Sequence, residues 1–255
     1  MHPIFFSIGK LTVYSYGFFV ALGFFVASIY LSNKIKKSKE KLLSQDEFYS
    51  FFVYEMIFVL IGLRLFYVLT NLQEFTTTPF DVFKVWQGGL TYYGGFISGL
   101  IFLIIYAKKK HLPLLKLLDF FGPSLPLGHA IGRIGCFLAG CCYGKETNVP
   151  WSVVFTDKNS SAVLGVHVHP TQLYESFGNF LIFIFLHFYS KKNPQKGQVI
   201  AVYFISYAIL RFIVEFFRND PDRGSQYFGL SISQIVSICL FIIGVFIVCK
   251  NKKKK

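Results

Sequence analysis

Seven stretches of 18 to 23 mostly apolar residues recur along the sequence and limit what it can fold into. A helix that crosses a bilayer needs about 20 such residues. The stretches are residues 13–32, 48–70, 86–107, 114–132, 172–189, 197–217 and 231–249. The sequence therefore predicts an all-α integral membrane protein, a single polytopic domain over residues 1–255 with about seven transmembrane helices.

The composition supports a bilayer as the surroundings of this chain. Hydrophobic residues make up 53% of it and charged residues only 15%, which is more apolar surface than one soluble core can hide. The net charge of +13 is high, but the lysines form short runs between the apolar stretches. We find no basic face with interleaved aromatic residues, so we expect no nucleic-acid partner.

The distribution of Lys and Arg predicts the orientation of the helices. Loops 33–47, 108–116 and 190–196 and the tail from Lys250 together hold 17 of the 26 basic residues. Seven basic residues fall in the opposite set of loops, and positive loops are retained in the cytoplasm. The N-terminus is therefore expected outside and the C-terminus in the cytoplasm.

The fourth apolar stretch contains breaks, and a long connection follows it. Gly122, Pro123 and Pro126 predict a kinked or broken helix, which is tolerated where protein or a wet cavity satisfies the backbone. Residues 133–170 then form the longest outer-face loop. A loop of that length without obvious secondary structure is usually functional or disordered.

Polar residues form a stripe within the sixth stretch. Tyr207, Arg211, Glu215 and Arg218 are spaced four, four and three residues apart, which places them on one face of a helix. Charges within a membrane are costly and are functional candidates by default. The alternative is an Arg211–Glu215 ion pair that holds helices together, with Arg218 extending to the membrane interface.

Arg133 is a candidate for binding phosphate. Glycines surround it at positions 132, 135, 140 and 144, and small residues permit close approach of a ligand. Together with Arg211 or Arg218, its guanidinium could clamp a phospholipid headgroup. Taken alone, an arginine at this point is also explained as an interfacial anchor.

The segment from Gly88 to Gly99 is open to two interpretations. Its paired glycines are typical of helix packing in lipid. Tyr92 and Tyr93 between the pairs would be interfacial aromatics in that case, or hydrogen-bonding groups beside a backbone wall.

Three of the five cysteines, Cys136, Cys141 and Cys142, lie in one short stretch. With His129 they hint at zinc, but the spacing matches no standard ligand pattern. We therefore expect no metal, and favour a local disulfide or free thiols.

Five segments together resemble the prolipoprotein diacylglyceryl transferase family. They are SYG (15–17), GGLTYYGGFISG (88–99), GRIGCFLAGCCYG (132–144), HPTQLYE (169–175) and LRFIVEFFRNDPDRG (210–224). They occur in the order found in the family and nearly span the chain.

The resemblance implies an enzyme of the bacterial cell (inner) membrane with its active site facing the periplasm. Such an enzyme moves the sn-1,2-diacylglyceryl group of phosphatidylglycerol to the lipobox cysteine thiol of a prolipoprotein, forms a thioether and releases glycerol phosphate. No cofactor is implied. The chemistry needs a thiolate nucleophile and a group that holds the departing phosphate.

The resemblance matches Arg133 to the family's phosphatidylglycerol-binding arginine and Arg211 to its second essential one. Tyr16, Gly144 and Glu215 also match family positions, and the remaining candidates come from the segments described above. The expected catalytic residues are Arg211, Tyr93, His169, Tyr16 and Glu215. The expected phosphatidylglycerol-binding residues are Arg133, Arg218, Gly94, Gly95 and Gly144.

The chain departs from the family pattern at three positions. Tyr93 replaces a frequent histidine, and Cys136 and Cys141 replace asparagine and glutamate. A tyrosine hydroxyl ordinarily loses its proton near pH 10, so the general base is open, and His169 is the alternative.

Three other functions compete with this one. A small permease would also have broken helices and intramembrane charges, but no inverted repeat is visible. A catalytically inactive relative is suggested by Tyr93. A phospholipid-synthesising transferase of the CDP-alcohol type would need paired aspartates on a helix, and Asp220 and Asp222 lack that setting.

Overall fold

The computed structural model describes residues 1–9, 11–37, 42–76, 78–84, 88–219, 226–227 and 229–252. The chain forms two compact units, one of Met1–Leu31 with Leu118–Lys255 and the other of Ser32–Leu117. Asp220 and Asp222, considered above, lie outside the described residues.

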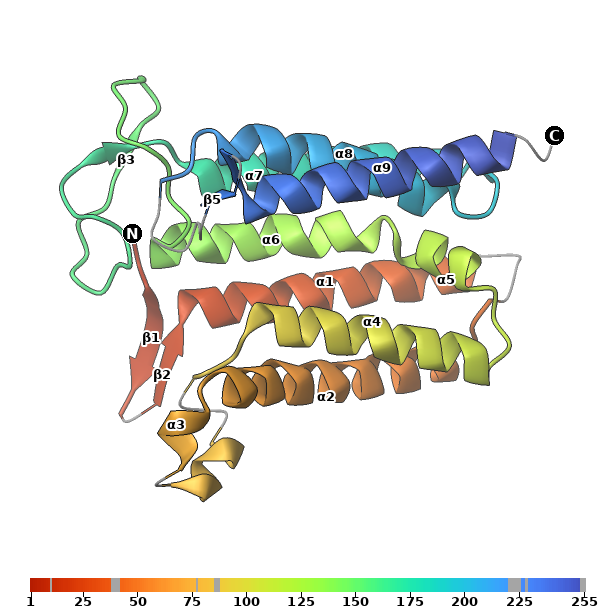
Figure 1. Ribbon diagram of the computed structural model, residues 1–255, viewed down its shortest axis with the longest axis horizontal. Coiled ribbons are helices and arrows are strands. Elements are labelled where there is room, and N and C mark those ends of the chain that lie inside the picture. Colours follow the sequence, from red (N-terminus) through yellow and green to blue (C-terminus); the bar gives the residue numbers. More distant parts are fainter. Residues whose placement is uncertain are drawn as a thin grey trace. The chain divides into compact units, whose positions relative to one another are not determined.

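Helices make up most of the described chain (Figure 1). The α-helices are α1 (Ser15–Lys37), α2 (Gln45–Thr70), α3 (Leu72–Phe75), α4 (Tyr92–Lys109), α5 (Leu114–Phe121), α6 (Ser124–Ala139), α7 (Thr171–Ser190), α8 (Gln198–Glu215) and α9 (Ile232–Lys252). A short 3-10 helix, η1, spans Pro79–Phe83. Three two-stranded antiparallel pairs join β1 (Ile4–Ile8) to β2 (Leu11–Tyr14), β3 (Val153–Val154) to β4 (His167–Val168), and β5 (Gln226–Tyr227) to β6 (Leu230–Ser231).

Among the described residues, four helices are long and apolar enough to cross a membrane. They are Ser15–Lys37, Gln45–Thr70, Gln198–Glu215 and Ile232–Lys250. These four coincide with predicted spans, and α4 and α7 coincide with two more. The prediction of a helical membrane protein is thereby supported.

The fourth predicted span is two helices. The chain leaves the helical path between α5 and α6, at Gly122 and Pro123, as the prediction of a broken segment required. The predicted end at residue 132 is wrong, because α6 continues to Ala139. It ends at Gly140, whose φ of 83° favours glycine and whose amide donates to the carbonyl of Cys136.

This extension corrects two further predictions. Arg133 lies inside α6, so the connection to α7 begins near residue 140 and not at residue 133. The connection is also not free of structure, since β3 and β4 pair within it. A small apolar core holds it together, made by Tyr143, Phe155, Ala162 and Val168.

In the Ser32–Leu117 unit, α2 packs against α4 through glycine. A Cβ at Gly94 would collide with the carbonyl oxygen of Gly62, so the close approach of the two backbones requires glycine here. Arg64 on α2 is buried and holds the segment before α4. Its guanidinium donates to the carbonyl oxygens of Asp81, Val82, Gly88 and Gly89.

In the other unit, α6, α7, α8 and α9 pack in sequence order. The hydroxyl of Ser176 donates to the carbonyl of Ala130 and joins α7 to α6. Asp119 accepts from the amides of Gly197 and Ile200 and so caps the start of α8. These contacts fix the three helices that carry the candidate site.

Candidate active site

A buried carboxylate on α7 gathers charged side chains from α6 and α8. Nη2 of Arg133 lies 2.9 Å from Oε1 of Glu175, and Nη1 of Arg211 lies 3.6 Å from Oε2 of the same group. Nε2 of His129 is 3.6 Å from Oε1. The Glu175 side chain is only 2% exposed, so these contacts replace its hydration.

His129 enters the cluster as a neutral acceptor. Its Nε2 accepts a hydrogen bond of 3.1 Å from Nε of Arg133, four residues along α6. An imidazole nitrogen that accepts a hydrogen bond carries no proton. The histidine therefore orients Arg133 without adding a charge.

A second carboxylate belongs to α8 itself. Nη2 of Arg211 lies 2.9 Å from Oε2 of Glu215 and also donates to the hydroxyl of Ser233 on α9 at 2.8 Å. The predicted Arg211–Glu215 ion pair is confirmed. It joins residues of one helix, and the link between helices comes from Glu175.

Arg218 follows the end of α8 and completes the cluster. Its Nη1 lies 3.8 Å from Oε2 of Glu215. The side chain is 6% exposed, so it packs within the protein beside Glu215. Its backbone pairs with Gly144 in an antiparallel bridge.

We call Arg133, Arg211, Arg218, Glu175, Glu215 and His129 the arginine cluster. Its three guanidinium groups face two carboxylates and a neutral imidazole. Nη1 of Arg211 is buried and makes no hydrogen bond to any residue that the structure describes. A buried guanidinium group with an unused donor is suited to an anionic ligand.

Gly144 and His169 meet beside the cluster. The amide of Gly144 donates to the carbonyl of His169, and a Cβ at Gly144 would lie 2.6 Å from Cβ of His169. Nδ1 of His169 is 3.1 Å from the hydroxyl of Tyr174. Burial lowers the pKa of His169, which favours a neutral imidazole that can accept a proton.

Tyr16 lies near the start of α1, against α6. A Cβ at Gly135 would be 3.2 Å from Cα of Tyr16, so the two helices are close at this point. Gly135 lies two residues after Arg133. Tyr16 is thus in the same unit as the arginine cluster, and 49% of it is exposed.

Tyr93, Gly94 and Gly95 belong to the other unit. Tyr93 is 55% exposed. A Cβ at Gly95 would lie 2.7 Å from the side chain of Leu63, and Gly94 contacts α2 as described above. Helix packing therefore accounts for both glycines, while a lipid-binding role for them stays a prediction.

Sequence reasoning missed the centre of this site. It considered His129 only as a zinc ligand and gave Glu175 no role. The signal for Glu175 was present, since it is an acidic residue inside the apolar stretch 172–189.

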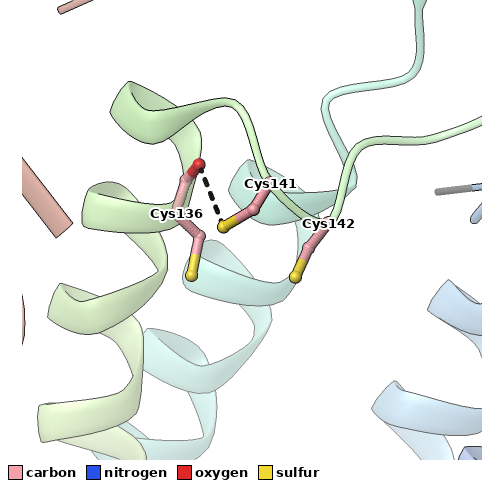
Figure 2. A group of neighbouring side chains, drawn as sticks. All are labelled: Cys136, Cys141 and Cys142. Atoms are coloured by element: carbon pink, nitrogen blue, oxygen red, sulfur yellow. Dashed lines mark hydrogen bonds between the residues drawn. The ribbon is translucent and has the colours of Figure 1, made fainter. Parts of the chain in front are cut away.

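The three neighbouring cysteines are free thiols (Figure 2). Their Sγ atoms all lie within 4.8 Å of one another, and His129 is not part of the group. Hydrogen bonds from Cys136 and Cys141 lower the pKa of the Cys142 thiol, with Arg133 and Arg218 contributing. Of the two alternatives expected from the sequence, a local disulfide or free thiols, the structure has the free thiols.

The fold and the site define a multi-pass helical membrane protein with a buried cluster of charged side chains. The family model for prolipoprotein diacylglyceryl transferase matches residues 3–250, and the chain belongs to this family.

The sequences of curated relatives match this chain along nearly its whole length. A phosphatidylglycerol–prolipoprotein diacylglyceryl transferase of Clostridium tetani is 40% identical over 97% of this chain and 96% of its own length. A protein of the same name from Finegoldia magna is 37% identical over 100% of this chain and 97% of its own. One from Clostridium perfringens, with the same name followed by the number 2, is 36% identical over 97% and 94%.

Proposed function

We propose that this chain transfers the sn-1,2-diacylglyceryl group of phosphatidylglycerol to the lipobox cysteine of prolipoproteins. The thiolate sulfur attacks the glyceryl carbon that bears the phosphate ester. A carbon–sulfur bond forms, the carbon–oxygen bond breaks, and glycerol phosphate leaves. The names of the relatives support this reaction. The structural observation that carries it is the buried, unused Nη1 donor of Arg211, which shares Glu175 with Arg133.

The arginine cluster is suited to the leaving group. A departing glycerol phosphate gains negative charge as the bond breaks, and donors fixed in advance stabilise that charge. Glu175 and Glu215 fix Arg133 and Arg211 at 2.9 Å each. Arg133, Arg211 and Arg218 are assigned to the phosphate, with Glu215 as a positioning residue.

The proton of the attacking thiol needs a base. His169 is supported by its lowered pKa and by its position beside Gly144, whose strand partner is Arg218. Tyr16 is assigned to orienting the substrates, because it packs against α6 near Arg133 and about half of it is exposed. A substrate-orienting role for Tyr93 is proposed from the family resemblance alone. Gly144 is assigned to the wall of the lipid site beside Arg218. A lipid-binding role for Gly94 and Gly95 is proposed from the family resemblance alone.

The membrane arrangement proposed for this function has seven spanning helices in one polytopic domain. The N-terminus faces the periplasm, and the lysine-rich C-terminus faces the cytoplasm of a bacterial cell with the protein in its inner membrane. Basic loops on one side support this orientation. A reporter enzyme fused after residue 255 should be active only if it is one that functions in the cytoplasm.

The permease alternative is not favoured. Each of the relatives named above is a transferase by name, and the family model covers nearly the whole chain. An inactive relative is distinguished from an enzyme by assay.

Transfer of labelled diacylglyceryl from phosphatidylglycerol to a lipobox peptide tests the proposal. Purified protein in detergent should form the thioether, and Arg133→Ala should reduce the rate by about a hundredfold or more. Lys158→Ala is the matched control, because Lys158 is an exposed cation of the 140–170 connection, and it should keep the wild-type rate. Absence of product from folded wild-type protein would refute the proposal.

A further inference from the structure

The three cysteine sulfurs converge at the C-terminal end of α6. Cys136 is buried in the last turn of the helix, and Cys141 and Cys142 follow the helix end at Gly140. The thiol of Cys141 lies 3.8 Å from the carbonyl oxygen of Cys136 and donates to it. Figure 2 shows the three sulfurs gathered in the space between the helix and the segment that follows it.

The backbone bends to make this arrangement. Gly140 has a φ of 83°, and Cys142 has a φ of 60° although it is not glycine. A left-handed conformation at a residue with a side chain is uncommon and persists only where surrounding contacts hold it. The hydroxyl of Thr171 donates to the carbonyl of Cys142 at 2.7 Å, and Nε2 of Gln172 donates to that of Cys141 at 2.7 Å. Both donors lie in the first turn of α7, so the two cysteines are held from a second helix.

We propose that Cys136, Cys141 and Cys142 form a binding site for a thiophilic metal ion of the Zn(II) type. Sulfurs that each lie about 2.3 Å from one ion in a trigonal site are about 4 Å apart. The observed separations, all within 4.8 Å, approach that value. Binding forms three metal–sulfur bonds and releases the three thiol protons to solvent.

Three sulfurs in one place fit an ion better than a disulfide. A disulfide uses two sulfurs and leaves the third beside it, whereas a trigonal ion uses all three. Zinc with three protein ligands keeps an open fourth position, which water can fill. The inference departs from the sequence-based expectation of no metal, because that expectation rested on ligand spacing and not on the convergence of the sulfurs.

Cd(II) is a suitable probe, since its thiolate complexes absorb in the ultraviolet. Full-length protein, reduced and exchanged into oxygen-free detergent buffer, should bind one equivalent, and Zn(II) should displace it. Cys136→Ser, Cys141→Ser and Cys142→Ser should each weaken binding by about tenfold or more. Cys239→Ser and Cys249→Ser are the matched controls, because these two cysteines are exposed on α9, and they should bind as wild type does.

A second measurement needs no variant. Zn(II) should protect the thiols of Cys136, Cys141 and Cys142 from alkylation, while Cys239 and Cys249 react at an unchanged rate. Mass spectrometry of the labelled peptides identifies the protected residues. The inference is overturned if no equivalent of metal binds, if Zn(II) protects none of the three, or if two of them are joined in a disulfide in protein purified without reductant.

Discussion

Arg133 on α6 and Glu175 on α7 form an ion pair of 2.9 Å in a position where the carboxylate is almost fully buried. Such a pair stabilises little in net terms, because both charges lose their water. The ion pair instead orients the arginine side chains, since Glu175 also faces Arg211 from α8. One carboxylate thus sets the positions of two of the three arginines.

Replacing Glu175 by glutamine should destabilise the protein. Loss of one partner leaves buried guanidinium groups without their counter-charge, which costs about 3–5 kcal/mol. We expect a clear fall in the unfolding temperature in detergent, measured by near-ultraviolet circular dichroism. Glu146→Gln, at an exposed acidic residue, should change it little. Equal unfolding temperatures for the two variants would contradict the role given to Glu175.

Arg211→Lys should inactivate the transferase although it keeps the charge. The guanidinium of Arg211 reaches Glu175, Glu215 and Ser233 at once, which a single ammonium group cannot do. We expect kcat/KM for lipid transfer to fall by about a hundredfold, about 2.7 kcal/mol of transition-state stabilisation. Ser233→Ala, which removes one neutral hydrogen bond, should cost less than about tenfold. A Lys variant with wild-type kcat/KM would show that charge alone suffices.

The rate should depend on pH through His169. Burial lowers its pKa, so the imidazole stays neutral below the ordinary value of about 6.5 and loses its basic form only at lower pH. Transfer rates should therefore persist at pH 6.5 and decline as the solution is made more acidic. His169→Gln should be slow at neutral pH and should lack this decline. If the variant keeps both the rate and the decline, another residue is the base.

Two glycines of the 132–144 segment should respond in opposite ways to alanine. At Gly144 the new Cβ would lie 2.6 Å from Cβ of His169 and 2.7 Å from the carbonyl oxygen of Phe217, an overpacking that costs about 1–3 kcal/mol. At Gly132 a Cβ meets nothing within 4 Å, and alanine favours the helix by up to about 1 kcal/mol. Gly144→Ala should therefore lower the unfolding temperature and Gly132→Ala should keep or raise it. The reverse order would contradict the packing described for Gly144.

The apolar stretches predicted the helices well, because a span must satisfy its own backbone in lipid whatever its neighbours are. The end of α6 was not predictable in the same way. Glycines at 132 and 135 weaken a helix in isolation, but in the folded chain Gly135 allows α1 to pack closely at Tyr16. Tertiary contact decides the boundary there, and Arg133 is inside the helix as a result.

Only part of the site could be predicted from the sequence, for a similar reason. Spacing along one helix predicts the Arg211–Glu215 pair, which needs only a four-residue period. The contacts of Glu175 with Arg133 and Arg211 join three helices, and periodicity within one segment carries no information on them. The convergence of the three cysteines likewise depends on left-handed backbone at Gly140 and Cys142, which residue spacing does not reveal.

Binding of phosphatidylglycerol to the arginine cluster tests the central claim most directly. The dissociation constant would be measured in detergent for wild type, for Arg133→Gln and for the exposed control Lys158→Gln, with phosphatidylglycerol and with a neutral diacylglycerol. Wild type and the control should bind phosphatidylglycerol alike, and Arg133→Gln should bind it about tenfold or more weakly, while diacylglycerol binding is the same in all three. Equal affinity of Arg133→Gln and wild type for phosphatidylglycerol would show that the cluster does not hold the phosphate.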